Sequence, residues 1–170
     1  MDNMTTATLN MVITKMIDAP VDGVWRAWSE ASLVKQWWGP RRFTAPLAKM
    51  DFKVGGKSLV CMRSPEGFEI YNTWTYTEII PLERVKFIHH FSDKDGNSID
   101  PSALGMPPGF PYSVPHVITL KAMGDRKTEI TVTEFGYNND QIVALSKAGM
   151  GECLEKMAEC LANVGGPSIA

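Results

Sequence analysis

The segment NNDQIVALSKAGMGECLEKMAECLANVGG, from Asn138 to Gly166, decides how this chain folds. Its apolar residues recur at intervals of three or four, which is the spacing of one face of an α-helix. That face carries Met150, Cys153, Leu154, Met157, Leu161 and Val164. Off the face lie Glu152, Glu155, Lys156 and Glu159. The pattern predicts a long amphipathic helix from about Asp140 to Val164 that lies across a β-sheet and forms the inner wall of the core.

Two glycines interrupt this helical pattern, at Gly149 and Gly151. Each costs about 1 kcal/mol relative to alanine in a helix interior. Such a cost is explained if another group must approach the helix backbone closely. Both a packed structural element and a bound ligand would meet that condition, and the sequence leaves the two open.

The chain before the helix has the sequence patterns of β-strands. NMVITKMIDAP, from Asn10 to Pro20, alternates with Met11, Ile13 and Ile17 on one side, as a half-buried strand does. Six further strand-like segments follow, separated mostly by short turn signals such as Gly55-Gly56 and Gly124-Asp125. They are FTAPLAKMDFKVGG, KSLVCMRS, FEIYNTWTYTEII, ERVKFIHHF, HVITLKAM and TEITVTEF. Short links between successive strands predict an antiparallel meander.

Two short helices are expected between the first strand and the others. After Pro20, Val21, Val24, Trp25 and Trp28 recur at helical spacing. Ser32 could cap a second short turn from Leu33 to Trp38, which Gly39 and Pro40 would terminate.

The adjacent tryptophans Trp37 and Trp38 stand where this second turn ends. Consecutive side chains of a helix point about 100° apart, so only one of the two is expected to go inward. We expect one indole to anchor the short helices to the sheet and the other to border a cavity. A purely structural role for both is the alternative, since aromatic clusters are usually packing residues.

Composition narrows the class of protein. A chain of 170 residues with 44% hydrophobic content predicts one domain over residues 1–170, with a core from about 8 to 164. The net charge of -2 and the absence of a basic run argue against nucleic acid as a partner. No apolar run reaches the roughly 20 residues of a membrane span, and no secretory signal is visible. With Cys61, Cys153 and Cys160 in no CxxC pair, we expect a reducing, cytoplasmic location.

Several of these segments together resemble a known family. DAPVDGVWRAWSE, LVKQWWGP, FKVGG, YTEIIPLERVKF and GMGECLEKMAECL are similar, in order, to landmarks of the START-like (SRPBCC) superfamily. The most similar branch is named after the activator of the heat-shock chaperone ATPase and also includes a calicheamicin-sequestering protein. The resemblance, from about Thr8 to Val164, implies an α+β helix-grip (Bet v-like) fold. In that fold a curved antiparallel sheet of about seven strands wraps a long C-terminal helix, with two short helices after the first strand.

The same resemblance bears on the cavity that this fold encloses. The family commonly has glycine at the position of Trp74 and tryptophan at the position of Met150. An inward Trp74 would fill volume that relatives leave open, so smaller or flatter ligands are expected. The long segment from Ser92 to Pro115 is too long for a tight hairpin, and either an ordered lid or a disordered loop would fit it.

Residues suited to catalysis are few. His89 and His90 are adjacent on a strand and therefore project to opposite faces, while His116 is distant in sequence, so a metal site is not expected. One histidine could face the cavity beside Glu78 or His116 as an acid or base, although a hydrogen-bonded structural histidine is the favoured reading. The spacing establishes no pairing for the carboxylates Glu66, Glu69, Glu78 and Glu134, and most are expected to be solvated. No catalytic residue, metal or cofactor is assigned.

We therefore expect a binding protein for a small hydrophobic or aromatic molecule, held between sheet and helix. The candidate ligand-binding residues are Trp37, Trp38, Trp74, Tyr76, Phe87, His89, His116, Met150 and Met157. The resemblance implies two alternatives: a chaperone-cofactor-like interaction module, and a cyclase- or hydrolase-type enzyme (polyketide cyclase-like) that uses pocket histidines or acids. Of these outcomes a non-enzyme is favoured, and a homodimer stays open.

Overall fold

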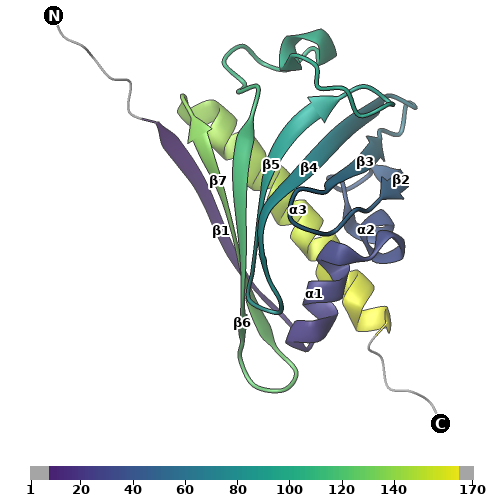
Figure 1. Cartoon of the computed structure of the whole chain (residues 1–170), viewed down its shortest axis with the longest axis vertical. Helices are drawn as coiled ribbons and strands as arrows, with labels where there is room; N and C mark the ends of the chain where they lie inside the picture. Colours follow the sequence, from purple (N-terminus) through teal and green to yellow (C-terminus); the bar gives the residue numbers. More distant parts are fainter. Residues whose placement is uncertain (1–7, 165–170) are drawn as a thin grey trace, which may run out of the picture.

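The computed structural model describes residues 8–164 and contains one antiparallel sheet with three α-helices (Figure 1). The strands lie in the order β1-β7-β6-β5-β4-β3-β2. Their bounds are β1 Leu9–Ile17, β2 Thr44–Lys49, β3 Lys57–Arg63, β4 Glu69–Ile80, β5 Arg84–Ser92, β6 Val114–Ala122 and β7 Thr128–Tyr137. The helices are α1 Val21–Ser29, α2 Ala31–Trp37 and α3 Asp140–Val164. This element order confirms the predicted α+β helix-grip fold.

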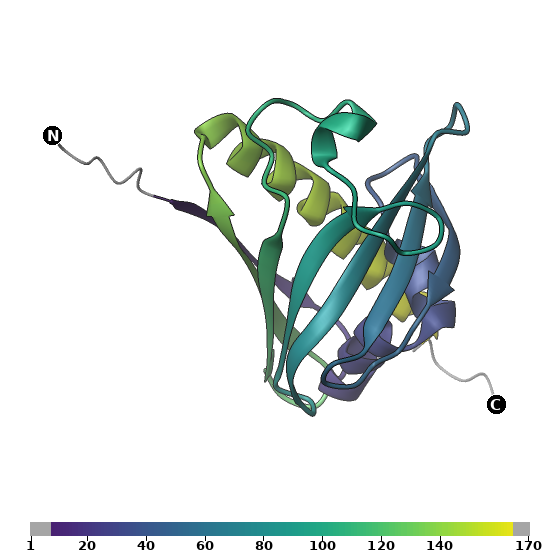
Figure 2. The ribbon, with the colours of Figure 1, turned by 45° about the horizontal axis from the view of Figure 1, so that its top comes forward.

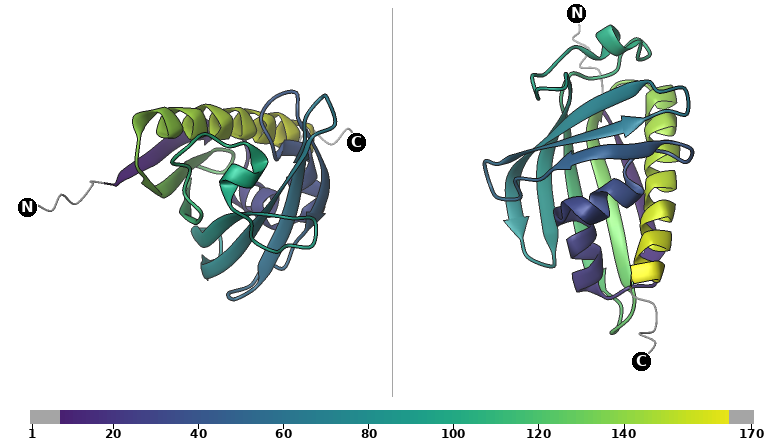
Figure 3. Two further views of the ribbon diagram at one scale, coloured as in Figure 1. Left: turned by 90° about the horizontal axis from the view of Figure 1, so that it is seen from above. Right: turned by 90° about the vertical axis from the view of Figure 1, so that its right-hand side faces the viewer.

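Helix α3 crosses the concave face of the curved sheet, and α1 and α2 lie beside its C-terminal half (Figures 1 and 3). Its first turn is capped by the Asn139 side chain, whose Oδ1 accepts a hydrogen bond of 2.9 Å from the Ile142 amide. The predicted apolar stripe faces the sheet: Met150, Cys153, Leu154, Met157 and Leu161 are all buried. The side chain of Val164, the last member of that stripe, lies outside the described residues. Within residues 8–164, no helix is long and apolar enough to cross a membrane.

The junction between α1 and α2 differs from the prediction. Glu30 is at once the C-cap of α1 and the N-cap of α2, and its carbonyl accepts the amides of Leu33 and Val34. Ser32 is therefore not the cap, because the helix has already begun at Ala31. A junction of one residue forces a sharp turn between the two helices.

Both adjacent tryptophans are buried, so the expectation that only one goes inward was wrong. Helix α2 ends at Trp37, and Trp38 is an extended C-cap residue with φ -70° and ψ 134°. The 100° rule for consecutive helical side chains does not apply beyond the helix end. Trp37 packs under α1, where its Nε1 donates a 2.8 Å hydrogen bond to the Ala27 carbonyl. Trp38 turns to the space between sheet and α3.

A half-buried lysine ties the turn after Trp38 to the long helix. The ammonium of Lys156, on α3, donates to the carbonyls of Gly39, Pro40 and Phe43 at 2.9, 3.3 and 3.1 Å. Desolvation of this amine lowers its pKa. Three oriented carbonyls replace the water that the ammonium loses, so the tryptophan-bearing turn is held at a fixed place on the helix.

The long segment between β5 and β6 folds over the open end of the sheet (Figure 2). It is shorter than predicted, Asp93 to Ser113, because β6 begins at Val114. The Asp93 carboxylate accepts the amides of Asp95 and Asn97, both at 2.9 Å, which forms its first turn. A short 3-10 helix, Pro101–Leu104, follows. Phe110 then packs against Phe91 and Tyr137, with ring centroids 5.4 and 6.1 Å apart, so the loop is an ordered cover.

Candidate functional site

A cavity of about 460 Å³ lies between the sheet, the first half of α3 and the loop. That volume is within the range of roughly 300–1,000 Å³ typical of small-molecule sites. Its lining is mainly apolar, with one polar wall. The lining residues are Trp38, Pro40, Phe43, Met62, Ile70, Asn72, His89, Phe91, Met106, Pro107, Phe110, His116, Glu134, Tyr137, Leu145, Ser146, Gly149, Met150 and Cys153.

The first polar pair of this wall is His116 with Glu134. The two residues face each other across β6 and β7, and His116 Nε2 is 3.1 Å from Glu134 Oε2. The other ring nitrogen, Nδ1, donates to the Val114 carbonyl at 2.9 Å. Nε2 is therefore the ring nitrogen that contacts the carboxylate. Each side chain is only 6% exposed, so an acid and a base are buried together as a pair.

A bulge in β7 brings a tyrosine to the same wall. Strict alternation would place Glu134 and Gly136 on the inner face, but the β1–β7 register shifts between Leu9 and Met11, and Gly136 has φ 92°. Tyr137 is thereby turned inward, and its hydroxyl donates to Glu134 Oε1. Ser146 of α3 donates to the same hydroxyl at 3.0 Å. Burial and the nearby Glu134 raise the pKa of Tyr137, which keeps it protonated as a donor.

The second polar pair is Asn72 with His89. The Asn72 amide, on β4, lies 2.8 Å from His89 Nε2, on β5. Burial holds the pKa of His89 well below its usual value, and the charges of His116 and His90 act in the same direction. His89 is therefore a neutral imidazole. Its ring centroid is 5.6 Å from that of His116, so the two pairs form one continuous polar wall.

The structure divides the candidate residues predicted from the sequence into two groups. Trp38, His89, His116 and Met150 line the cavity. Trp37, Trp74, Tyr76, Phe87 and Met157 are buried elsewhere in the core and do not line it. We use the name aromatic cluster for Trp28, Trp37, Trp74, Tyr76 and Phe87.

The aromatic cluster closes one end of the cavity. Trp74 points inward from β4, and its ring centroid lies 5.1 Å from both Trp38 and Phe87. Phe87 in turn stacks on His116 at 4.7 Å. Trp74 is thus separated from the cavity by one layer of rings, and its removal would extend the cavity toward α1 and α2.

The carboxylates sort differently from the prediction. Glu78 does not lie beside a histidine: it is on the outer face, where Arg84 Nε approaches its Oε1 at 2.6 Å. Glu69 likewise pairs with Arg63, and Glu66 is exposed. Only Glu134 of the four is buried. The alternation of β7 carries the signal for its inward direction, but the sequence analysis did not single out Asn72, Tyr137 or Ser146.

The two helix glycines serve different purposes. A Cβ built on Gly151 would lie 3.4 Å from Ile13 Cδ1, so β1 packs closely on the helix there. A Cβ on Gly149 would meet nothing within 4 Å, and Gly149 lines the cavity. A packing contact therefore accounts for Gly151, whereas Gly149 leaves open space.

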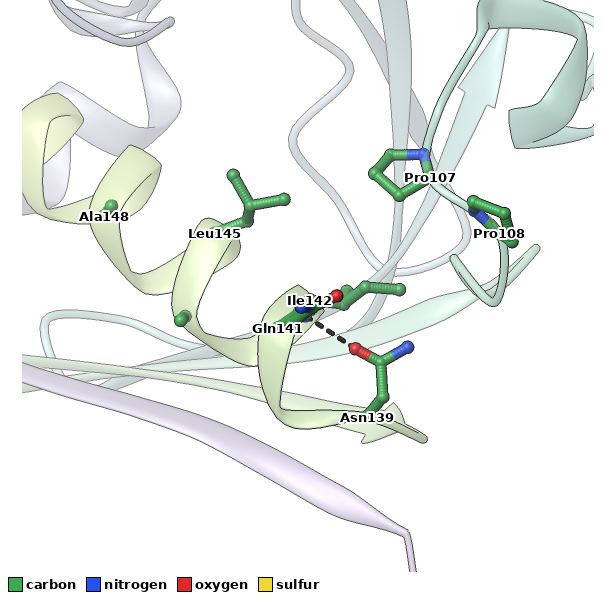
Figure 4. Close-up of a pocket in the computed structure, with 8 residues that line it drawn as sticks. Pro107, Pro108, Asn139, Gln141, Ile142, Leu145 and Ala148 are labelled. Carbon is green, nitrogen blue, oxygen red and sulfur yellow. Dashed lines mark hydrogen bonds between the residues drawn. The ribbon is translucent and has the colours of Figure 1, made fainter.

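A surface groove of about 660 Å³ lies outside the cavity, between the loop and the start of α3. Figure 4 shows Pro107 and Pro108 of the loop facing Leu145 and Ile142 of the helix. Pro107 and Leu145 line both spaces, so these two residues form the rim between groove and cavity. In the part of the chain that the structure describes, no three His, Cys, Asp or Glu side chains gather as a metal site requires.

Comparison with known proteins places this architecture. The chain belongs to the family described as Activator of Hsp90 ATPase homolog 1-like protein, whose model matches residues 18–162. This confirms the branch that the sequence motifs resembled. No curated protein matches the chain significantly.

Solved structures agree with this family. A protein from Arthrobacter aurescens has 24% sequence identity and a TM-score of 0.75, over 91% of this chain and 87% of that one. A Nitrosomonas europaea protein has 21% identity and a TM-score of 0.72, over 92% and 96%. The AHSA1 protein of Silicibacter pomeroyi has 17% identity and a TM-score of 0.73, over 92% and 99%. At these identities the likeness shows the fold alone.

Proposed function

We propose that this protein binds a small, largely hydrophobic molecule in the cavity between the sheet and α3. The observation that supports this most directly is the cavity itself, which is mainly apolar and carries its polar groups on one wall. Apolar walls supply affinity and a few placed polar groups supply orientation. Met106, Pro107 and Phe110 of the loop form the outer wall of the cavity. Pro107 and Leu145 at its rim also line the surface groove, which offers a route of entry.

Native mass spectrometry of the protein purified from its own host tests this proposal. A retained small molecule at near-stoichiometric occupancy, released on denaturation and unchanged by incubation, is the expected result. An unoccupied protein that also fails to bind any apolar fluorophore would contradict the proposal. The three cysteines are unpaired and buried, and we propose a reducing, cytoplasmic setting for this activity.

A second candidate is an enzyme that uses acid–base chemistry, and the His116–Glu134 pair favours it. A buried acid–base pair on the wall of an apolar cavity could exchange a proton with a bound substrate. Turnover that is lost in His89→Ala or in His116→Ala would support this candidate, whereas ligand retention without turnover supports the first. The family name invites a chaperone role as well, which a pull-down of that chaperone would support; the cavity geometry has no bearing on it.

A further inference from the structure

We propose that the Asn72–His89 pair is the polar subsite of the cavity, and that it selects an uncharged ligand whose head group both donates and accepts a hydrogen bond. A hydroxyl or a lactam has this property. The inference rests on the proposed function and adds the chemical class of the ligand. It rests on which polar atoms of the cavity wall already have hydrogen-bond partners within the protein and which do not.

The His116–Glu134 side of the wall is saturated. Both nitrogens of His116 and both oxygens of Glu134 have partners within the protein. The Tyr137 hydroxyl donates to Glu134 and accepts from Ser146, which uses the Ser146 proton as well. The protons of Tyr137, Ser146 and His116 Nδ1 are already donated within the protein, so a ligand acceptor could use them only by breaking buried hydrogen bonds, which is costly.

The Asn72–His89 side is not saturated. Asn72 is 1% exposed, yet its Oδ1 has no hydrogen-bond partner among the described residues. His89 uses Nε2 for Asn72, which leaves Nδ1. Buried polar atoms are seldom left unpaired, so an unpartnered amide oxygen on a cavity wall points to a missing partner.

The unpaired atoms define the partner. If the Asn72 amide donates to Nε2, the neutral His89 carries its proton on Nδ1, and the pair offers Oδ1 as an acceptor and both Nδ1–H and the second amide N–H as donors. If the amide is turned over, Oδ1 accepts from Nε2–H, and the pair offers Nδ1 as an acceptor and the amide NH₂ as a donor group. Either arrangement matches a group that both accepts and donates.

The charged residues of the cavity wall also favour an uncharged ligand. Among the described residues, no lysine or arginine lines the cavity, so a carboxylate ligand would find no free cation there. Among the described lining residues Glu134 is the only carboxylate, and it is already paired with His116. Trp38 Nε1 also lacks a hydrogen-bond partner among the described residues and lines the same cavity, so it is a further neutral donor for an acceptor on the ligand.

Bicyclic probes of matched size test the selection by isothermal titration calorimetry at pH 7. They are 2-naphthol (hydroxyl), 2-quinolone (lactam), 2-methoxynaphthalene (accepts but does not donate) and 2-naphthoate (anion). We expect 2-naphthol or 2-quinolone to bind up to about tenfold more tightly than 2-methoxynaphthalene, as the one additional donated hydrogen bond would give, and 2-naphthoate to bind most weakly. The tighter of the first two identifies the head-group class.

Two variants of β4 form a matched pair. Asn72→Leu should remove the advantage of 2-naphthol and 2-quinolone while changing 2-methoxynaphthalene binding by less than about twofold, since apolar contacts remain. Thr73→Val is the control: Thr73 is also buried with an oxygen that has no partner among the described residues, but it points to the opposite face of the sheet, where a Cβ built on Gly96 would lie 4.0 Å from its Cγ2. It should bind all four probes as the parent protein does.

The outcomes are distinguishable. Equal binding of all four probes, or tightest binding of 2-naphthoate, overturns the uncharged polar subsite while leaving the cavity a ligand site. Loss of selectivity in Thr73→Val equal to that in Asn72→Leu also overturns it. If none of the four probes binds while an apolar fluorophore does, the polar subsite is overturned and the cavity remains a ligand site. If the fluorophore also fails to bind and the purified protein is unoccupied, the proposed function fails as well.

Discussion

The two ends of the sheet–helix interface are built from similar elements but filled differently. Toward α1 and α2, the aromatic cluster occupies the space completely, with Trp37 and Trp74 almost inaccessible. Toward the loop, the same sheet and the same helix leave a cavity of about 460 Å³ with a polar wall. The filled end stabilises the fold through dense packing. The open end lacks that packing and contains a cavity whose wall carries unpaired polar atoms. The comparison shows that dense packing and open space occupy different halves of one core.

The largest expected effect comes from a charge on the inner face of α3. Leu154 is fully buried, so Leu154→Asp places an unpaired carboxylate in apolar surroundings and should abolish the cooperative unfolding transition. Leu145→Asp is the control on the same helix, because Leu145 is 56% exposed, and it should cost no more than about 1 kcal/mol. Circular dichroism with urea unfolding measures both, and a folded Leu154→Asp protein would refute the inner-wall placement.

The second-largest effect is expected from a substitution that opens the filled end. Trp74→Gly removes a ring that closes the cavity and should lower the free energy of unfolding by about 3–5 kcal/mol. In the fraction that stays folded, we expect tighter binding of a bulky apolar fluorophore, because the cavity extends toward α1 and α2.

A second tryptophan provides the control for that variant. Trp25 packs on Phe52, away from the cavity, so Trp25→Ala should destabilise without changing fluorophore binding. Titration of the dye at equal folded concentration decides the matter. Unchanged affinity in Trp74→Gly would mean that neighbouring side chains collapse into the vacated space.

The polar wall should make stability depend on pH. Folded His89 stays neutral because burial, His116 and His90 lower its pKa, whereas an unfolded histidine takes up a proton below about 6.5. The unfolded state then binds more protons, so stability falls as pH drops below about 6.5, by at most about 1.4 kcal/mol per pH unit from this group.

The source of this slope can be isolated by substitution. His89→Gln should flatten the decline in urea-unfolding free energy between pH 6.5 and 5. His90 projects to the other face and bonds Ser113 at 2.7 Å, so His90→Gln should keep most of it. A slope that survives in His89→Gln would assign the proton uptake to another group.

The smallest expected effect concerns the two glycines of α3. For Gly149→Ala, stability should rise while ligand affinity falls. Gly149→Ala should raise the free energy of unfolding by up to about 1 kcal/mol, since alanine favours helix, while its methyl group narrows the cavity and weakens ligand binding. Gly151→Ala faces Ile13 instead and should leave binding unchanged. Calorimetry of 2-naphthol binding to both variants compares them, and equal affinities would place Gly149 outside the binding space.

Local periodicity was sufficient for much of the fold. The 3.6-residue pattern predicted α3 with the bounds that the structure shows, and alternation predicted seven strands in the right order. These features depend on which side of an element each residue faces, and neighbouring residues in the sequence determine that. The sequence failed at Ser32 and Trp38, because the helix begins two residues and ends one residue before the expected places.

For the candidate site, the sequence predicted which side of the sheet each residue faces, but not where along the core that residue lies. It pointed Trp74, His89 and His116 inward, yet whether an inward residue meets the cavity or the aromatic cluster depends on strand register and on where α3 crosses the sheet. It also could not pair Glu134 with His116, since those residues are opposite each other only through the β6–β7 register.

What the sequence by itself determined was therefore the set of elements, their order and their buried faces, because hydrophobic periodicity is a local property of the chain. Only the tertiary structure decided that Gly136 turns Tyr137 onto Glu134, that Lys156 fixes the tryptophan turn, and that Asn72 has an unpaired oxygen in a cavity. Each of these features depends on contacts between residues that are far apart in the chain. Those contacts, and the polar atoms that they leave without a partner, are fixed only once the sheet has closed around the helix.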